Sequence, residues 1–402
     1  MKLPKAAWQS REGMRALLKA LGAETGDTRY VGGCVRDTLM GLEVSDVDLA
    51  TRVPPGEVME RLKSARIKAV PTGLAHGTVT AVVAGQPVEV TTLRRDVATD
   101  GRRATIAYTD DWREDAARRD FTINALSADP ETLEVHDYFG GEEDLAARRV
   151  RFIGDPLKRI AEDHLRILRF FRFHARFGEG EADPEALAAC TARANDLMAL
   201  SRERIADELT KLLALARPEA AVASMVNRAI LKPVLPEIQE EGVARLETLI
   251  ERERLAAIPP HPLRRLAALL PADPETVAAV AARLRLSTRA SKRLVSAASW
   301  GDGVEEKPEV LAYRIGGEEA VDRILLNEGD PRQALTLSGW VKPRLKLGGG
   351  ELIAMGLSPG PVVAATLQAL EREWAKAGFP DSRPEQEALA RRHVEKALKG
   401  GL

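Results

Sequence analysis

Two aspartates near the start of the chain, Asp46 and Asp48, have the type and spacing of paired metal ligands. They lie in SDVDLAT (45–51), which we predict to be a strand, and alternate side chains of a strand project from one face. Two carboxylates on one face repel each other unless a cation lies between them. Mg²⁺ fits this need, because it takes one or two carboxylates plus substrate phosphates and can activate a hydroxyl for attack. The alternative is a solvated D-x-D turn.

A glycine pair precedes these aspartates. Gly32-Gly33 follows the strand-like run TRYV and precedes the helix-compatible segment CVRDTLM. Backbone amides without side chains at the start of a helix can face a phosphate. A glycine pair alone is often only a turn, but its place ahead of two spaced aspartates favours phosphate binding beside a metal site.

A third acid is expected on a neighbouring strand. The segment 77–92 predicts two strands joined at Gly85-Gln86, and the second of these contains Glu89. Its neighbours Val88 and Val90 belong to the opposite, apolar face. We therefore take Glu89 as the third catalytic acid with Asp46 and Asp48, the alternative being an exposed edge position.

The segment 157–177 predicts one long helix with acids and arginines on the same face. Residues 151–177 hold seven Lys/Arg against three acids, a net charge of +4, which is typical of a local anion site. The alternative is a salt-bridged amphipathic helix. The charged face carries Arg159, Glu162, Asp163, Arg166 and Arg169; the packing side carries Leu157, Ile160, Ile167, Leu168 and Phe171; Phe170 and Phe173 fall near the charged face without explanation.

The elements that position these residues change near residue 150, from short β-branched runs to Ala-, Leu-, Arg- and Glu-rich segments with helical periodicity. A chain of 402 residues predicts two or more domains.

The composition bears on partners and location. The net charge of −1 does not by itself predict nucleic-acid binding, and an aromatic content of 4% leaves few side chains for stacking on bases. Two distant cysteines and no long apolar run favour a cytoplasmic protein without a membrane span.

Four motifs in order resemble one family. The stretch GG-x-x-RD-x-x-x-G-x-x-x-x-D-x-D (32–48) is similar to the signature of DNA polymerase β type nucleotidyltransferases. The segments RRDFTINAL (118–126), EDHLR (162–166) and RERIADEL (202–209) resemble the next motifs of the bacterial and eukaryotic class of tRNA nucleotidyltransferases and of the related bacterial poly(A) polymerases. The motifs fall within residues 25–215, and a weaker resemblance covers 356–374.

The resemblance implies roles for individual residues. Asp46 and Asp48 match the metal ligands, and the template pair that bonds the Watson–Crick edge of the incoming base matches Asp163 and Arg166, with Glu162 beside them. The carboxylate accepts from an exocyclic amine, which cytosine and adenine have and uracil and guanine lack at that position. The implied nucleotide-binding set is Gly32, Gly33, Arg36, Arg119, Asp120, Asn124, Glu162, Asp163, Arg166 and Arg169.

The resemblance further implies an α+β fold: a polymerase β type palm, built on a mixed sheet with helices, followed by an all-helical C-terminal half. We expect a palm over 1–147, a neck with the base-recognition helix over 148–222, a body over 223–345 and a tail over 346–402 that binds tRNA. The expected reaction adds CCA to the tRNA 3′ end from CTP and ATP, uses Mg²⁺ and releases pyrophosphate. Neither a membrane nor a stable protein partner is implied.

Other functions remain open at this point. A poly(A) polymerase shares the chemistry, but residues 371–402 hold seven Lys/Arg and six Asp/Glu, so the basic tail expected of a processive mRNA binder is missing. A CC-adding or an A-adding subtype fits the same motifs. A non-catalytic RNA-binding protein would not need both aspartates, the glycine pair, RRD and EDHLR together.

Overall fold

The computed structural model describes all residues except 101–102, 300, 302–305 and 400–402. The chain divides into two compact units, one formed by Met1–Leu212 with Ala220–Val234 and the other by Leu213–Glu219 with Leu235–Leu402. The residues singled out above for chemistry all lie in the first unit. The finer division into palm, neck, body and tail remains a prediction.

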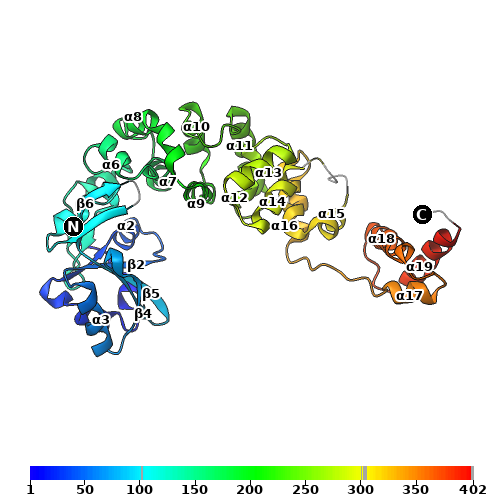
Figure 1. Ribbon diagram of the computed structural model, residues 1–402, viewed down its shortest axis with the longest axis horizontal. Helices are drawn as coiled ribbons and strands as arrows, with labels where there is room; N and C mark the ends of the chain where they lie inside the picture. The colour runs from blue at the N-terminus through cyan, green and yellow to red at the C-terminus, as the bar shows by residue number, and fades with distance from the viewer. Residues whose placement is uncertain (101–102, 300, 302–305, 400–402) are drawn as a thin grey trace. The chain divides into compact units, whose positions relative to one another are not determined.

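A mixed seven-stranded sheet forms the base of the first unit, with strand order β3-β4-β5-β2-β1-β8-β9 (Figure 1). Only β2 and β5 pair in parallel among these strands as described; the other neighbours are antiparallel. A separate two-stranded ribbon consists of β6 and β7. The strands are β1 Thr28–Val31, β2 Val47–Thr51, β3 Lys68–Gly73, β4 Thr78–Val83, β5 Gln86–Thr92, β6 Arg94–Asp100, β7 Arg103–Tyr108, β8 Ser127–Ala128 and β9 Val135–His136.

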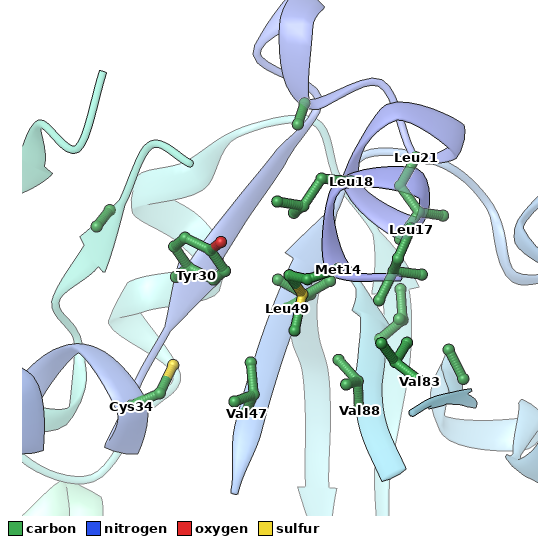
Figure 2. Close-up of a cluster of buried hydrophobic side chains, with 14 of the residues drawn as sticks. Met14, Leu17, Leu18, Leu21, Tyr30, Cys34, Val47, Leu49, Val83 and Val88 are labelled. Atoms are coloured by element: carbon green, nitrogen blue, oxygen red, sulfur yellow. The ribbon is translucent and has the colours of Figure 1, made fainter. Parts of the chain in front are cut away.

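One face of this sheet is buried under helices α1 (Met14–Ala20) and α3 (Pro55–Ser64). Leu17 and Leu18 of α1 meet Val47, Leu49 and Val88 of the central strands in a common cluster (Figure 2). Because strand side chains alternate between faces, burial of Val47, Leu49, Val88 and Val90 directs the residues between them to the other face. The apolar core therefore decides where Asp48 and Glu89 point.

The helical part of the first unit corrects one prediction. The expected single helix over 157–177 is two helices, α6 (Pro156–Glu162) and α7 (Arg166–Phe177). Asp163 has extended backbone angles, φ −152° and ψ 106°, and its carboxylate accepts a hydrogen bond from the backbone N–H of Leu165 at 3.1 Å. Aspartate competes in this way with helical hydrogen bonding. The prediction of one continuous helix was wrong because periodicity does not register such a turn.

The break also changes which side chains pack. Leu157, assigned above to the packing side, is 48% exposed. Phe170 and Phe173 are buried, since α7 turns them toward Phe121, whose ring centroid lies 5.1 Å from that of Phe173. The remaining helices of this unit are α2 Gly33–Leu39, α4 Trp112–Ala117, α5 Gly141–Ala146, α8 Pro184–Ala192, α9 Arg202–Leu213 and α10 Glu219–Asn227, with the short 3₁₀ helix η4 at Thr122–Asn124.

The second unit has helices and no strand among its described residues, and it holds two apolar clusters, one around Leu249, Leu311 and Leu325 and one around Leu352, Leu370 and Trp374. Its helices are α11 Glu240–Leu255, α12 Pro262–Leu269, α13 Pro274–Arg283, α14 Thr288–Ala298, α15 Pro308–Ile315, α16 Gly317–Leu326, α17 Gly349–Ala354, α18 Pro361–Lys376 and α19 Arg383–Leu398. No described helix is long and apolar enough to cross a membrane. The predicted α+β class, a mixed sheet followed by a helical half, is confirmed.

Candidate active site

The acids predicted to do chemistry meet at the centre of the sheet. Asp48 on β2 is directly opposite Glu89 on β5 in the parallel register, where adjacent strands lie about 4.8 Å apart. Asp46 is exposed and stands one residue before β2, with its carboxylate accepting a hydrogen bond from the hydroxyl of Ser45 at 2.8 Å. The prediction that both aspartates are strand residues on one face was therefore wrong for Asp46, because the strand begins at Val47.

The electrostatic environment of Asp48 and Glu89 favours a bound cation. Burial, followed by the charge of Glu89, raises the pKa of Asp48 to about 6, and Asp46 adds a smaller effect of the same sign. Of the nearby groups, Arg119 opposes this shift. Among the described residues no set of three or more Asp, Glu, His or Cys side chains is arranged as a complete metal site. Two carboxylates with excess negative charge nonetheless fit Mg²⁺, which binds through one or two carboxylates and takes its other ligands from water and phosphates.

A pocket of about 410 Å³ opens in the first unit and collects nearly all the residues predicted to bind nucleotide. Four arginines and two aspartates contribute to its wall, so its charge is positive. The lining residues are Gly32, Gly33, Arg36, Arg119, Asp120, Asn124, Asp163, Arg166, Arg169 and Phe173. Glu162 does not line this pocket.

Gly32 is needed where the chain enters α2. Its φ is +68°, a left-handed value that side chains rarely adopt, and a Cβ there would lie 2.8 Å from Nη1 of Arg119. Glycine therefore lets the Arg119 guanidinium approach the backbone between β1 and α2. The Arg119 side chain also pairs with Asp115 at 3.6 Å.

Arg36 is almost completely buried, and each side of its guanidinium has a partner. The Nε donates to Asp37 at 2.7 Å, and Nη1 donates to the side-chain oxygen of Asn124. The guanidinium carbon lies 4.0 Å from the ring centroid of Phe177. Burial lowers the pKa of Arg36, although Asp37 counteracts it. An arginine fixed in this way presents its remaining N–H groups in one direction.

A buried carboxylate continues the network from the palm to α7. The Asn124 amide donates to Asp120 Oδ1 at 2.9 Å, and Nε and Nη2 of Arg169 both donate to Oδ2 at 2.8 and 2.6 Å. Burial alone would raise the pKa of Asp120, but the positive charge of Arg169 and the hydrogen bonds from Asn124, Arg169 and the backbone of Phe121 together outweigh burial and hold that pKa below its ordinary value. Asp120 of the RRD motif therefore links Asn124 to Arg169.

The predicted base-reading residues are held by partners on α6 and α9. Asp163 accepts a hydrogen bond from Nη2 of Arg204 at 2.8 Å. Nη1 of Arg166 donates to Glu162 at 2.5 Å and to the backbone carbonyl of Arg159 at 2.7 Å. Glu162 thus contacts Arg166 without lining the pocket itself, so it supports the pocket wall.

Three supporting residues escaped prediction from the sequence. Arg204 and Glu208 lie on α9 within RERIADEL, the motif recognised above, and Glu208 accepts from Arg172 at 2.6 Å. Their i, i+4 spacing on one helix was the available signal. Phe173, the third, lines the pocket and packs against the guanidinium groups of Arg169 and Arg172, at 5.1 and 4.7 Å from their central carbons.

Comparisons with known proteins agree with this geometry. Residues 28–151 match the family described as Poly A polymerase head domain, and residues 181–241 match that described as Probable RNA and SrmB- binding site of polymerase A. The chain is 33% identical to the human mitochondrial CCA tRNA nucleotidyltransferase 1, over 94% of this chain and 90% of that protein. It is 30% identical to the CCA-adding enzyme of Limosilactobacillus fermentum, over 90% of this chain and 92% of that protein.

Solved structures share the fold. A Bacillus stearothermophilus CCA-adding enzyme in complex with CTP superposes with a TM-score of 0.73 at 24% identity, covering 96% of this chain and 98% of that one. The Thermotoga maritima CCA-adding enzyme complexed with tRNA gives a TM-score of 0.66 at 21% identity, with 93% of each chain covered. The family resemblance and the fold inferred from the motifs are both confirmed.

Removing the charge of Asp48 should stabilise the cation-free protein. Since the folded-state pKa lies above the ordinary value, folding disfavours the charged form, and at pH 8 that cost is present in full. A shift of this size corresponds to at most about 3 kcal/mol, and we expect about 1–2 kcal/mol because Asp48 is partly exposed. In the presence of a chelator, Asp48→Asn should therefore raise the melting temperature of the first unit by a few degrees. The control is Asp46→Asn, which lies exposed; no gain for Asp48→Asn over this control would contradict the assignment.

The Asp120 carboxylate should contribute stability that depends on pH. Its pKa is lowered by folding, so its contribution is present above the unfolded value of 3.8 and is lost as the pH falls through the lower folded value. At pH 7, Asp120→Asn should reduce the free energy of unfolding by about 1–3 kcal/mol, because Arg169 loses a charged partner. The difference from the parent should shrink below about pH 4, as measured by urea unfolding. The exposed Asp110→Asn serves as control, and a difference that stays constant with pH would argue against the charge.

Proposed function

This chain belongs to the family of CCA tRNA nucleotidyltransferases, and we propose that it adds C, C and A to the 3′ end of tRNA from CTP and ATP. The observation that carries the proposal is one pocket lined by Arg36, Arg119 and Arg169 together with Asp163 and Arg166, in the same unit as Asp48. No nucleic-acid template is needed, because the protein itself presents the groups that read the base.

The transfer step is defined by the P–O bond that forms and the P–O bond that breaks. The 3′ hydroxyl of the RNA attacks the α-phosphorus of the nucleotide, a new P–O bond forms, the bond to the bridging oxygen of the β-phosphate breaks, and pyrophosphate leaves. The hydroxyl proton passes to a base, for which Glu89 is positioned opposite Asp48. Asp46 and Asp48 would hold Mg²⁺, which when bound supplies positive charge for the phosphates and the attacking oxygen.

The arginines of the pocket suit a triphosphate. Arg36, Arg119 and Arg169 each have a fixed guanidinium, and fixed donors aimed at developing charge need no reorganisation during the reaction. Asp120 and Asn124 hold Arg169 and Arg36 in place and are positioning residues in this proposal. Gly32 leaves room for the Arg119 guanidinium, and Gly33 lines the pocket beside it.

The choice of base rests on Asp163 and Arg166. In our proposal, the Asp163 carboxylate accepts from the exocyclic amine of cytosine or adenine, and Arg166 donates to the adjacent ring nitrogen. Arg204 and Glu162 hold these two side chains before the nucleotide arrives. Glu162, expected from the sequence to bind nucleotide, acts in this scheme through Arg166.

The rival functions lose ground for specific reasons. The relatives that span nearly the whole chain are CCA enzymes, which favours this activity over poly(A) addition. The intact set of acids and the assembled pocket argue against a non-catalytic RNA-binding protein. Sequencing of the reaction products will distinguish full CCA addition from addition of CC alone or of A alone. Because named relatives are mitochondrial, a cytoplasmic location remains a prediction.

The products test the proposal directly. Given a tRNA that ends at its discriminator base with CTP and ATP, the protein should add three nucleotides and stop, since one compact pocket reads the base and the sequence of residues 371–402, with seven Lys/Arg and six Asp/Glu, is not the basic tail of a processive enzyme. Sequencing of the product, with each nucleotide supplied alone and together, measures this. Long adenylate tails on generic RNA would establish the poly(A) activity instead, and A added only to a supplied CC end would indicate the A-adding subtype.

Base reading by Asp163 is tested by selectivity. Asp163→Ala should lower the preference for CTP and ATP over UTP and GTP by about 5- to 100-fold, because a bidentate base contact gives roughly 1–3 kcal/mol of discrimination. The KM for tRNA should stay unchanged. Asp207→Ala is the matched control, an acid on α9 paired at the surface with Lys211. Retention of full selectivity by a folded Asp163→Ala protein would reduce the segment to a salt-bridged scaffold.

A further inference from the structure

The face of the palm sheet that carries the acids continues into a row of hydroxyl groups. Glu89 on β5 is directly opposite Asp48 on one side and Thr80 of β4 on the other. Thr91 of β5 is opposite Thr78 in the same way. We call Thr78, Thr80 and Thr91 the threonine face; since residues opposite each other share a face, it lies on the same side of the sheet as the acids.

The threonine face is open while the other side of the same strands is closed. The three threonines are partly exposed and Glu89 is exposed, whereas Val79, Ala81, Val88 and Val90 between them are buried in the core. The hydroxyl groups pair with each other: Thr78 with Thr91 at 3.1 Å, and Thr80 with Thr72 of β3 at 2.7 Å. A hydroxyl has one donor and two acceptor positions, so each pair keeps capacity for a ligand.

The direction of the reaction requires an acceptor site on this side. Arg119, at the wall of the nucleotide pocket, lies beside Gly32 at the end of β1, the strand that pairs with β2. The nucleotide therefore approaches Asp48 from β1 and α2. In an in-line displacement the attacking oxygen and the leaving pyrophosphate lie on opposite sides of the phosphorus. Strand order β1-β2-β5-β4 puts Glu89 and Thr80 on that opposite side.

On the premise of the proposed function, we propose that the threonine face binds the ribose of the 3′-terminal nucleotide of the acceptor RNA, with Thr80 bonding the 2′ hydroxyl. The carboxylates of Asp48 and Glu89 make this part of the face acidic, which disfavours a phosphate there and leaves a neutral sugar as the compatible group. The 2′ hydroxyl both donates and accepts, as does the hydroxyl of Thr80, and it is the group that distinguishes RNA from DNA.

The test removes one hydroxyl from each partner. Thr80→Val keeps the shape and the strand preference of threonine but loses the hydrogen bond, and Thr80→Ser keeps the hydroxyl. Binding of a short acceptor helix that ends in either a ribose or a 2′-deoxyribose is measured by fluorescence anisotropy without nucleotide, and transfer of one CMP is measured on both RNAs. Thr191→Val, an exposed threonine on α8, is the matched control.

The parent, the control and Thr80→Ser should prefer the ribose end by about 3- to 10-fold, the value of one hydrogen bond. Thr80→Val should bind the ribose end as weakly as the parent binds the deoxyribose end, with no further loss on the deoxyribose end and no change in the KM for CTP. An undiminished ribose preference in Thr80→Val, or a change confined to the KM for CTP, would overturn the proposal. The binding measurement tests the role of the threonine face even if CMP transfer fails. Failure of CMP transfer counts against the proposed function alone.

Discussion

The parallel pairing of β2 with β5 is the constraint on which the rest of the site depends. It fixes Asp48 opposite Glu89, an arrangement that two carboxylates would not adopt by themselves. Burial first, and then the charge of Glu89, raise the pKa of Asp48. The pairing persists because Val47, Leu49, Val88 and Val90 on the reverse face are buried under α1 and α3. Figure 2 shows the first three of these side chains with Leu17 and Leu18 of α1. Burial of four such side chains is worth several kcal/mol, more than the repulsion at the edge. Apolar packing thus maintains a concentration of negative charge for which a cation is the natural partner.

The positive side of the site has the opposite organisation. Each pocket arginine is matched to an acid or amide before any ligand is present: Arg36 to Asp37 and Asn124, Arg119 to Asp115, Arg169 to Asp120, and Arg166 to Glu162. These bonds run from Arg36 of α2 through Asn124 of η4 and Asp120 to Arg169 of α7, so the residues proposed for the phosphates belong to one network. Such preorganisation is paid for in folding and spares the reaction the cost of reorienting donors.

The sequence predicts the parts of this arrangement that follow from local pattern. The strand containing Glu89, the core face of the sheet and the helical second half all follow from alternation and periodicity. The turn at Asp163 cannot be predicted in this way, because a helical wheel drawn through 157–177 takes no account of a side chain that accepts a hydrogen bond from the backbone N–H of Leu165. Arg204 is 41 residues from Asp163, and no spacing rule connects them. Without the family motifs, Arg119 and Asp120 would have remained an ordinary charged run.

The turn at Asp163 is also what makes base reading by a carboxylate plausible. One oxygen of Asp163 accepts from the backbone of Leu165 and the other from Arg204, so the carboxylate is oriented, yet each oxygen retains a second lone-pair site. An exocyclic amine can occupy that site without displacing Arg204. A carbonyl of uracil or guanine brings no proton, so two acceptors face each other and both lose their water, a cost of about 1–3 kcal/mol. In a continuous helix Asp163 would have its backbone N–H engaged and no such turn to fix its carboxylate. The local departure from helical geometry at Asp163, which the sequence pattern does not predict, is thus what would allow its carboxylate to recognise the base.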